Sequence, residues 1–197
     1  MLTEAVARAE GVIEGGTFEN EVLSGADLSR MELSRLRFIR CKFEDCDFSD
    51  GLIYDCRFEK CEFSLCRFED SYVKRSEFTG CRGSGAVFSG ARFRDSRFEG
   101  CALGCVNFIS SRWENCELKG CMLREAFWSA AKIKKLALAD CDLRGAEFFR
   151  TELRDVDLSD CEIEGICLSE DCRELRGAIL GYGQAAIAAA MMGIKLK

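Results

Sequence analysis

The strongest constraint on this chain is a large apolar side chain at every fifth position. In steps of five from Ile13 to Leu168, 32 consecutive positions carry Phe, Leu, Ile, Val or Trp, with Gly83 as the single exception. Thirteen of the 15 Phe and both Trp fall in this one phase. A period of five matches neither the 3.6-residue repeat of a helix nor the two-residue repeat of a strand. It indicates a chain that turns a corner every five residues.

A second position, two residues before each large one, is occupied mostly by Cys, Ala or Ser. Eleven of the 14 Cys lie in this class, and only Cys105, Cys167 and Cys172 lie outside it. Zinc ligands usually come as close pairs two to four residues apart, so one Cys per repeat argues against a metal site. Cys is also a small, readily buried residue that can replace Ala or Ser in a tight column. We therefore expect packing thiols, with room for one exposed thiol that has no catalytic role.

A longer period of twenty residues divides the repeat into four sides. One side stacks five phenyl rings, which we predict as the structural core: Phe18, Phe38, Phe58, Phe78 and Phe98. Side chains on successive coils are cross-strand neighbours, so like shapes are expected in one column. The prediction is an all-β, four-sided solenoid of about eight coils, a rod on the order of 40 Å long with a filled interior.

The five-residue unit resembles the consensus of the pentapeptide-repeat family, which is roughly A(D/N)LXX. It is seen in Ala26-Asp27-Leu28-Ser29-Arg30, in Cys141-Asp142-Leu143-Arg144-Gly145 and in Ala146-Glu147-Phe148. The resemblance implies a right-handed quadrilateral β-helix with four pentapeptides per coil.

Two irregularities interrupt the pattern. Gly83 lacks the large inward side chain, but the phase resumes without inserted residues, which predicts a dent and not a loop. After Leu168 the spacing returns two residues late, at Leu175 and Leu180, which predicts a short excursion over residues 169–174. We expect a single domain that comprises an N-terminal cap (1–12), the β-helix (13–168), a last irregular coil (169–182) and a C-terminal helix with its tail (183–197).

The C-terminal segment is rich in Ala and Met from Gln184 to Met192, and Gly193 is placed as a helix stop. Its apolar side chains can cap the rod, as an open solenoid requires, or pair with a second copy. We favour a homodimer, because so small a helix cannot cover the rod end and also hide its own apolar surface. The predicted interface comprises Leu180, Tyr182, Ile187, Met191, Met192 and Ile194.

The tail resembles the C-terminus of pentapeptide-repeat proteins of the Qnr and MfpA type. The matching residues are Tyr182, Gln184, Ala185, Gly193 and Ile194. This resemblance implies a dimer that binds DNA gyrase and topoisomerase IV as a DNA mimic and protects them from quinolones, a form of antibiotic resistance. The two inserted loops of many Qnr proteins are absent, because the phase is unbroken from Ile13 to Leu168. Protection and inhibition of the topoisomerase therefore both stay open.

Charge is unevenly distributed along the chain. The formal net charge is −6, from 34 acidic and 28 basic residues, which argues against direct nucleic-acid binding. Between residues 150 and 174 there are nine acidic residues against three basic ones. The predicted partner-binding residues form an acidic band: Asp155, Asp157, Asp160, Glu162, Glu164, Glu170 and Asp171. Such a band would steer the protein to a cationic groove, although solvated acids also keep a solenoid end soluble and unpaired.

Catalytic chemistry has little support in the sequence. There is no His, so no Ser/His or Cys/His pair can form, and a filled rod offers no substrate cavity. We expect a non-enzymatic protein without cofactor or metal. No secretory leader and no apolar stretch of about 18 residues is visible, so a cytoplasmic protein without membrane contact is expected. The alternative function is a general protein-interaction scaffold whose partner is not a topoisomerase.

Overall fold

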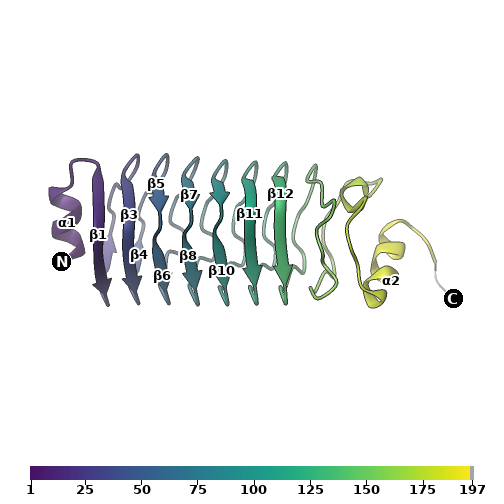
Figure 1. Ribbon diagram of the computed structural model, residues 1–197. Coiled ribbons are helices and arrows are strands. Elements are labelled where there is room, and N and C mark those ends of the chain that lie inside the picture. Colours follow the sequence, from purple (N-terminus) through teal and green to yellow (C-terminus); the bar gives the residue numbers. More distant parts are fainter. Residues whose placement is uncertain (196–197) are drawn as a thin grey trace.

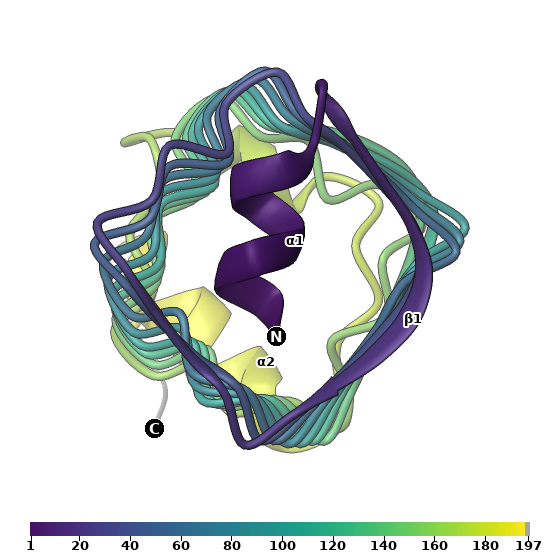
Figure 2. The same cartoon turned by 90° about the vertical axis from the view of Figure 1, so that its left-hand side faces the viewer.

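The chain winds into a parallel β-solenoid in a computed structural model that describes residues 1–195. Helix α1 (Leu2–Arg8) lies at one end of the rod and helix α2 (Tyr182–Met191) at the other, as Figure 1 shows. Viewed down the axis in Figure 2, the coils superpose into a four-sided tube with α1 across its opening. The expected all-β solenoid with a short C-terminal helix is therefore confirmed.

Most strands are three residues long because a corner ends them, whereas four strands of eight residues run through a corner, as β3 does at Arg35. The strands are β1 (Val12–Glu19), β2 (Val22–Ser24), β3 (Glu32–Ile39), β4 (Lys42–Glu44), β5 (Leu52–Tyr54), β6 (Arg57–Glu59), β7 (Tyr72–Lys74), β8 (Glu77–Thr79), β9 (Arg92–Arg94), β10 (Arg97–Glu99), β11 (Arg112–Lys119) and β12 (Lys132–Ala139), followed by the 3₁₀ helix η1 (Arg173–Leu175). Every pairing is parallel with a register of twenty residues, so that Phe38 lies between Phe18 and Phe58. This register is the physical basis of the twenty-residue period.

The corners explain the period of five. From the first coil to Asp155, the residue two positions after each inward position of the repeat adopts a left-handed backbone, as in Arg35 (φ 55°), Asp55 (φ 54°) and Leu65 (φ 64°). One left-handed residue reverses the curvature of the chain locally and allows the next short side to begin. The five-residue unit is thus one side of the tube plus one corner.

The number of regular coils is smaller than expected. Paired strands run from Val12 to Ala139, about six turns of the solenoid, whereas the sequence predicted about eight. Beyond β12 the twenty-residue spacing continues through isolated bridges, such as Asp142 with Glu162 and Glu147 with Cys167. Within residues 1–195, no backbone hydrogen bond joins β12 to segment 152–159. One side of the tube is therefore open at this point.

The interior is a set of stacked columns. Phe38, Phe58, Phe78 and Phe98 are buried, and the ring centroids of Phe58 and Phe78 lie 4.7 Å apart, with those of Phe78 and Phe98 at 4.5 Å. Phe18 is only partly buried, because it belongs to the first coil and has a neighbouring coil on one side only. Offset stacked rings of this kind add to the free energy gained by burying their area.

Seven cysteines form another column, at Cys41, Cys61, Cys81, Cys101, Cys121, Cys141 and Cys161, and all are buried. Most of these thiols lie near a backbone carbonyl of the preceding coil; Cys61 Sγ, for example, is 3.3 Å from the oxygen of Phe38. In the column beside it, burial raises the pKa of Cys56 to about 11. Buried thiols with raised pKa values are poor nucleophiles and poor ligands. Among the residues described, no cluster of Cys, Asp and Glu is arranged to hold a metal ion.

Gly83 is accommodated without disturbing the ladder. Its amide nitrogen donates to the carbonyl oxygen of Ala102 at 2.8 Å, as in an ordinary coil. A Cβ placed on Gly83 would lie 2.6 Å from the Phe63 ring and 3.0 Å from the Leu103 side chain. The space that the missing side chain leaves is therefore filled by its two neighbours in the column, and the predicted dent involves no loop.

The late return of the repeat after Leu168 is a true two-residue insertion. In regular coils the amide of the large inward residue donates to the carbonyl 19 residues ahead, as that of Leu143 does to Glu162 at 2.8 Å. Leu153 instead donates to Glu174 at 3.0 Å, and Leu158 donates to Ile179 at 2.9 Å, each 21 residues ahead.

No helix within the described residues is long and apolar enough to cross a membrane.

Candidate protein-binding surface

The acidic band lies on the outer surface of the last coils. Its seven residues (Asp155, Asp157, Asp160, Glu162, Glu164, Glu170 and Asp171) are all exposed. They occupy corners and outward positions that flank the inward residues Leu158 and Ile163. Apart from Asp171, none of them forms an ion pair within residues 1–195. The charge of this surface is therefore not neutralised locally.

The middle of the rod is different. There, acids and bases twenty residues apart meet on neighbouring coils, as in Arg75 with Asp55 at 2.6 Å and Arg67 with Asp47 at 2.6 Å. Each exposed pair contributes little to stability, but together the pairs cancel the charge of these coils. Acids without an ion-pair partner among the described residues also occur in the middle coils, for example Glu99, but the acidic band brings several of them together within the last coils.

Asp157 is held in its ionised form by its own loop. The amide nitrogen of Ser159 donates to its carboxylate at 2.9 Å. Hydrogen bonds from the Ser159 side chain and backbone lower the pKa of Asp157 below its ordinary value. This residue therefore keeps its charge to lower pH than a free aspartate.

Two acids near the insertion have other partners. Asp171 lies 3.5 Å from the Arg176 guanidinium and 3.9 Å from that of Arg173. Glu174 is buried, with 1% of its surface exposed. These two carboxylates contribute less to the anionic surface than composition alone suggests.

At the insertion the Glu174 carboxylate takes the place of a backbone carbonyl in the hydrogen-bond ladder between coils. It accepts hydrogen bonds from the Arg150 amide at 2.9 Å and from the Ser169 amide and hydroxyl at 3.2 and 2.6 Å. In a regular coil a backbone carbonyl accepts the corner amide, as that of Phe149 does from Ala130. Burial raises the pKa of Glu174, but the hydrogen bonds from Ser169 and Arg150 outweigh it and hold the pKa below its ordinary value. Nothing in the five-residue pattern indicated this role.

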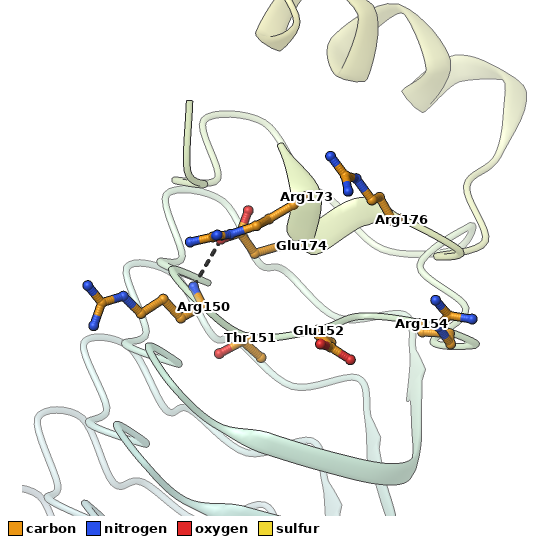
Figure 3. A pocket seen from close by; sticks show the side chains of 7 residues that line it. All are labelled: Arg150, Thr151, Glu152, Arg154, Arg173, Glu174 and Arg176. Carbon is orange, nitrogen blue, oxygen red and sulfur yellow. Dashed lines mark hydrogen bonds and ion pairs between the residues drawn. The ribbon is translucent and has the colours of Figure 1, made fainter. Parts of the chain in front are cut away.

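Beside Glu174 the insertion opens a groove of about 470 Å³. Its walls carry Arg150, Arg154, Arg173 and Arg176, and Figure 3 shows these side chains around it. The sequence analysis missed this arginine cluster, because the four residues become neighbours only through the insertion.

The predicted dimer residues fall into two groups. Leu180, Ile187 and Met191 are partly buried against the core of the rod. Tyr182, Met192 and Ile194 are exposed, with Tyr182 fully so. Ile179, which was not predicted, is also half exposed beside them. Helix α2 therefore covers the rod end with one face and leaves apolar side chains on the surface.

Gln184 fastens α2 to the last coil. Its side-chain nitrogen donates to the carbonyl oxygens of Leu158 and Cys161, each at 2.6 Å, and its side-chain oxygen accepts from the Gly181 amide at 2.8 Å. This buried side chain gives the Cys161 carbonyl a partner at the end of the rod, whereas the Leu158 carbonyl also accepts from the Cys161 amide at 2.8 Å.

These features define a parallel β-solenoid with a packed interior, left-handed corners every five residues and a helical cap at each end. Family models agree with this class. A model of the pentapeptide repeat region matches residues 52–128, and a model of eight copies of pentapeptide repeats matches residues 18–50 and 129–170. The chain belongs to the pentapeptide-repeat family. None of the curated proteins compared with it matches in sequence.

Several solved structures resemble this chain. A trypsin-treated point variant of QnrB1, described as a plasmid-mediated fluoroquinolone resistance protein, is 28% identical over 93% of this chain and 91% of that one, with a TM-score of 0.59. Full-length QnrB1 is 21% identical over 91% and 100% of the two chains, with a TM-score of 0.34. HetL, a pentapeptide-repeat protein involved in heterocyst differentiation regulation in the cyanobacterium Nostoc sp. strain PCC 7120, is 13% identical over 92% and 96%, with a TM-score of 0.32.

Proposed function

We propose that this protein is a non-enzymatic, homodimeric DNA mimic that binds a type II topoisomerase, DNA gyrase or topoisomerase IV, and modulates its activity or protects it from quinolone-type inhibitors. The observation that carries the proposal is the exposed acidic band at the C-terminal end of the rod, in which only Asp171 has an ion-pair partner among the residues described. A protein that acts on a topoisomerase in this way would work in the cytoplasm. The likeness to QnrB1, a fluoroquinolone resistance protein, supports this class of function.

Local charge density supports the mimicry. Duplex DNA carries one negative charge per about 1.7 Å, or about three charges over the roughly 4.8 Å that separate neighbouring coils. Within less than one coil this chain carries Asp155, Asp157, Asp160, Glu162 and Glu164. The net charge of −6 for the whole chain is far sparser. The anionic character is therefore comparable to that of a duplex only in the band.

The exposed end of α2 supports a dimer. Tyr182 at the start of α2, Met192 and Ile194 after its end, and Ile179 in the last coil leave apolar surface exposed at this end of the rod, and a two-fold dimer would cover such surface. The two acidic bands would then flank the junction, in the middle of a rod of double length. A cationic groove that holds a duplex would meet both bands together.

The decisive experiment is a gyrase supercoiling and DNA-cleavage assay with and without a quinolone. The wild-type protein should alter one or both activities at about micromolar concentration, in the range of many transient protein complexes. A variant with Asp155→Lys, Asp157→Lys, Asp160→Lys and Glu162→Lys should lose most of the effect, because it reverses the charge of the band and leaves the interior unchanged.

The matched control carries Glu69→Lys, Asp70→Lys, Glu99→Lys and Asp140→Lys, which are exposed positions on other coils. It changes the net charge by the same amount and should retain most of the activity. Equal losses in both variants would show that net charge, and not the band, matters. A wild-type protein without any effect would discard the topoisomerase and leave the scaffold with another protein partner.

A further inference from the structure

Two open grooves meet on the surface beside the insertion. The first, of about 470 Å³, is the groove with four arginines described above. The second, of about 500 Å³, is lined largely by apolar side chains, among them Ile109, Ala130 and Phe149. Both are also lined by Arg150 and Arg173, so the two grooves adjoin at these side chains. We call the combined feature the arginine groove.

The positive charge of the groove is only partly neutralised. Arg150 and Arg154 form no ion pair within residues 1–195, and Arg173 and Arg176 approach Asp171 no closer than 3.5 Å. The Glu174 carboxylate lies 3.9 Å from Arg173, but its oxygens already accept hydrogen bonds from Ser169 and the Arg150 amide. Guanidinium donors therefore remain free at the surface. In Figure 3 those of Arg150 and Arg173 lie toward one end of the first groove and those of Arg154 and Arg176 toward the other.

The second half of the groove adds exposed apolar surface. Ile109 and Phe149 are 37% and 39% exposed, and Ser129 and Ala130 of the coil between them line the same groove. An aromatic ring beside free arginines is the composition of energetically important sites in protein interfaces. The groove is also open along its length, whereas sites for small molecules enclose most of their ligand.

We propose that the arginine groove docks an acidic segment of a protein partner that carries an apolar side chain next to its carboxylates. The carboxylates would take bidentate hydrogen bonds from the guanidinium groups, and the apolar side chain would cover Phe149 and Ile109. A small phosphorylated ligand would use the arginines but leave the apolar half of the groove empty. This surface is opposite in sign to the acidic band and goes beyond the proposed topoisomerase contact.

The insertion explains how this coil forms the groove. In regular coils the next coil follows at the strand spacing and covers the corner. Here η1 occupies the extra length, with Cys172 in a left-handed conformation at its start (φ 47°). Arg173 and Arg176 thereby face Arg150 and Arg154 across the opening instead of stacking on them.

The test is a selection of short random peptides displayed on phage against the immobilised full-length protein, with counter-selection on an Arg150→Glu, Arg154→Glu variant. We expect the enriched peptides to combine at least two acidic residues with an aromatic or aliphatic one. A synthetic copy of the best peptide, followed by fluorescence anisotropy, should bind the variant about tenfold or more weakly. Its affinity should also fall with added salt.

Matched variants make the result specific. Arg92→Glu with Arg112→Glu changes two exposed arginines on β9 and β11 and should not weaken binding. Phe149→Ser should weaken it by removing the apolar contact. The charge reversal of the acidic band should leave peptide binding intact, so that failure of the topoisomerase proposal and failure of this one are distinguishable. Circular dichroism melts verify that each variant is folded.

Three outcomes would overturn the proposal. The first is enrichment of peptides without acidic residues. The second is equal binding by wild type and the Arg150→Glu, Arg154→Glu variant. The third is competition in which pyrophosphate displaces the peptide completely and Phe149→Ser has no effect, because the groove would then be a simple site for phosphate-like anions.

Discussion

At the scale of single residues, each side chain is set by its place in the five-residue unit. A left-handed backbone at the corner costs about 1 kcal/mol or more when the residue is not glycine. Leu65 adopts it at φ 64°, and its amide still donates to the Ser84 carbonyl in the next coil at 3.3 Å. At most corners the amide donates such a hydrogen bond to the next coil, which offsets this cost. Which side chains point inward and which point outward could be predicted from the sequence, because this depends only on the position of a residue within the five-residue unit.

At Gly83 the five-residue pattern alone gives the wrong expectation for the effect of a larger side chain on stability. The repeat alone suggests that a larger residue would fill an empty interior position and stabilise the rod. The Phe63 ring already occupies that space, because a Cβ at this position would lie 2.6 Å from it. Such occupancy depends on how neighbouring side chains relax, which the periodic pattern does not encode.

Gly83→Ala should therefore destabilise the protein by about 1 to 3 kcal/mol, the usual effect of overpacking a dense core. Gly104→Ala is the matched control, because its Cβ would meet nothing closer than 3.8 Å. Urea denaturation followed by tryptophan fluorescence compares the two variants, since Trp113 and Trp128 are buried in the same interior. A Gly83→Ala protein as stable as wild type, or more stable, would contradict this packing.

At the scale of elements, the weakest junction lies after β12. Segment 152–159 makes no backbone hydrogen bond to β12 among the residues described, so the last coil is held mainly through its other sides and through Glu174. Ile133 on β12 is partly exposed, whereas Trp113 in the preceding coil is buried. The length of the insertion could be predicted from the sequence. The role of the Glu174 carboxylate, which accepts hydrogen bonds across the insertion, could not be predicted, because an acidic side chain in a loop is ordinarily solvated.

Glu174 should make the stability of this end depend on pH. Its pKa in the folded protein is lowered, so its contribution is complete above the pKa of the unfolded chain, about 4.3, and is lost as the pH falls through the folded value. Glu174→Gln should cost about 1 to 3 kcal/mol at neutral pH, because the donors of Arg150 and Ser169 lose a charged acceptor. As the pH falls from about 4.3 through the lowered pKa of folded Glu174, the stabilities of wild type and variant should converge.

Hydrogen exchange of the amides between residues 150 and 180, at neutral and at acid pH, measures this contribution locally. Glu152→Gln is the control, since Glu152 is exposed and has no ion pair within the described part of the chain. A difference between wild type and Glu174→Gln that stays constant with pH would exclude the charged form of Glu174 as the stabilising species.

At the scale of the whole molecule, three surfaces gather at the C-terminal end. The acidic band, the arginine groove and the exposed part of α2 all lie within the last coils and the helix that follows, whereas the middle of the rod carries charge pairs between coils. The rod sets the distance and orientation of these surfaces. The charge imbalance behind the band could be predicted from sequence. The grouping of arginines on one side of it required the three-dimensional course of the insertion.

The dimer is the prediction that belongs to this scale. The mass of the chain is 22.1 kDa, so light scattering or sedimentation should give about twice that value for the wild type. Tyr182→Glu combined with Met192→Glu should produce a monomer, because each change places a charge on the exposed apolar patch while Gln184 keeps α2 on the rod. Leu65→Glu, at an exposed apolar residue in the middle of the rod, should leave the mass unchanged. A wild-type monomer at tens of micromolar, or a double variant that is still dimeric, would show that α2 serves only as the cap. Since the acidic bands flank the junction in our proposal, the monomeric variant should also weaken the effect on gyrase without any change in the band itself.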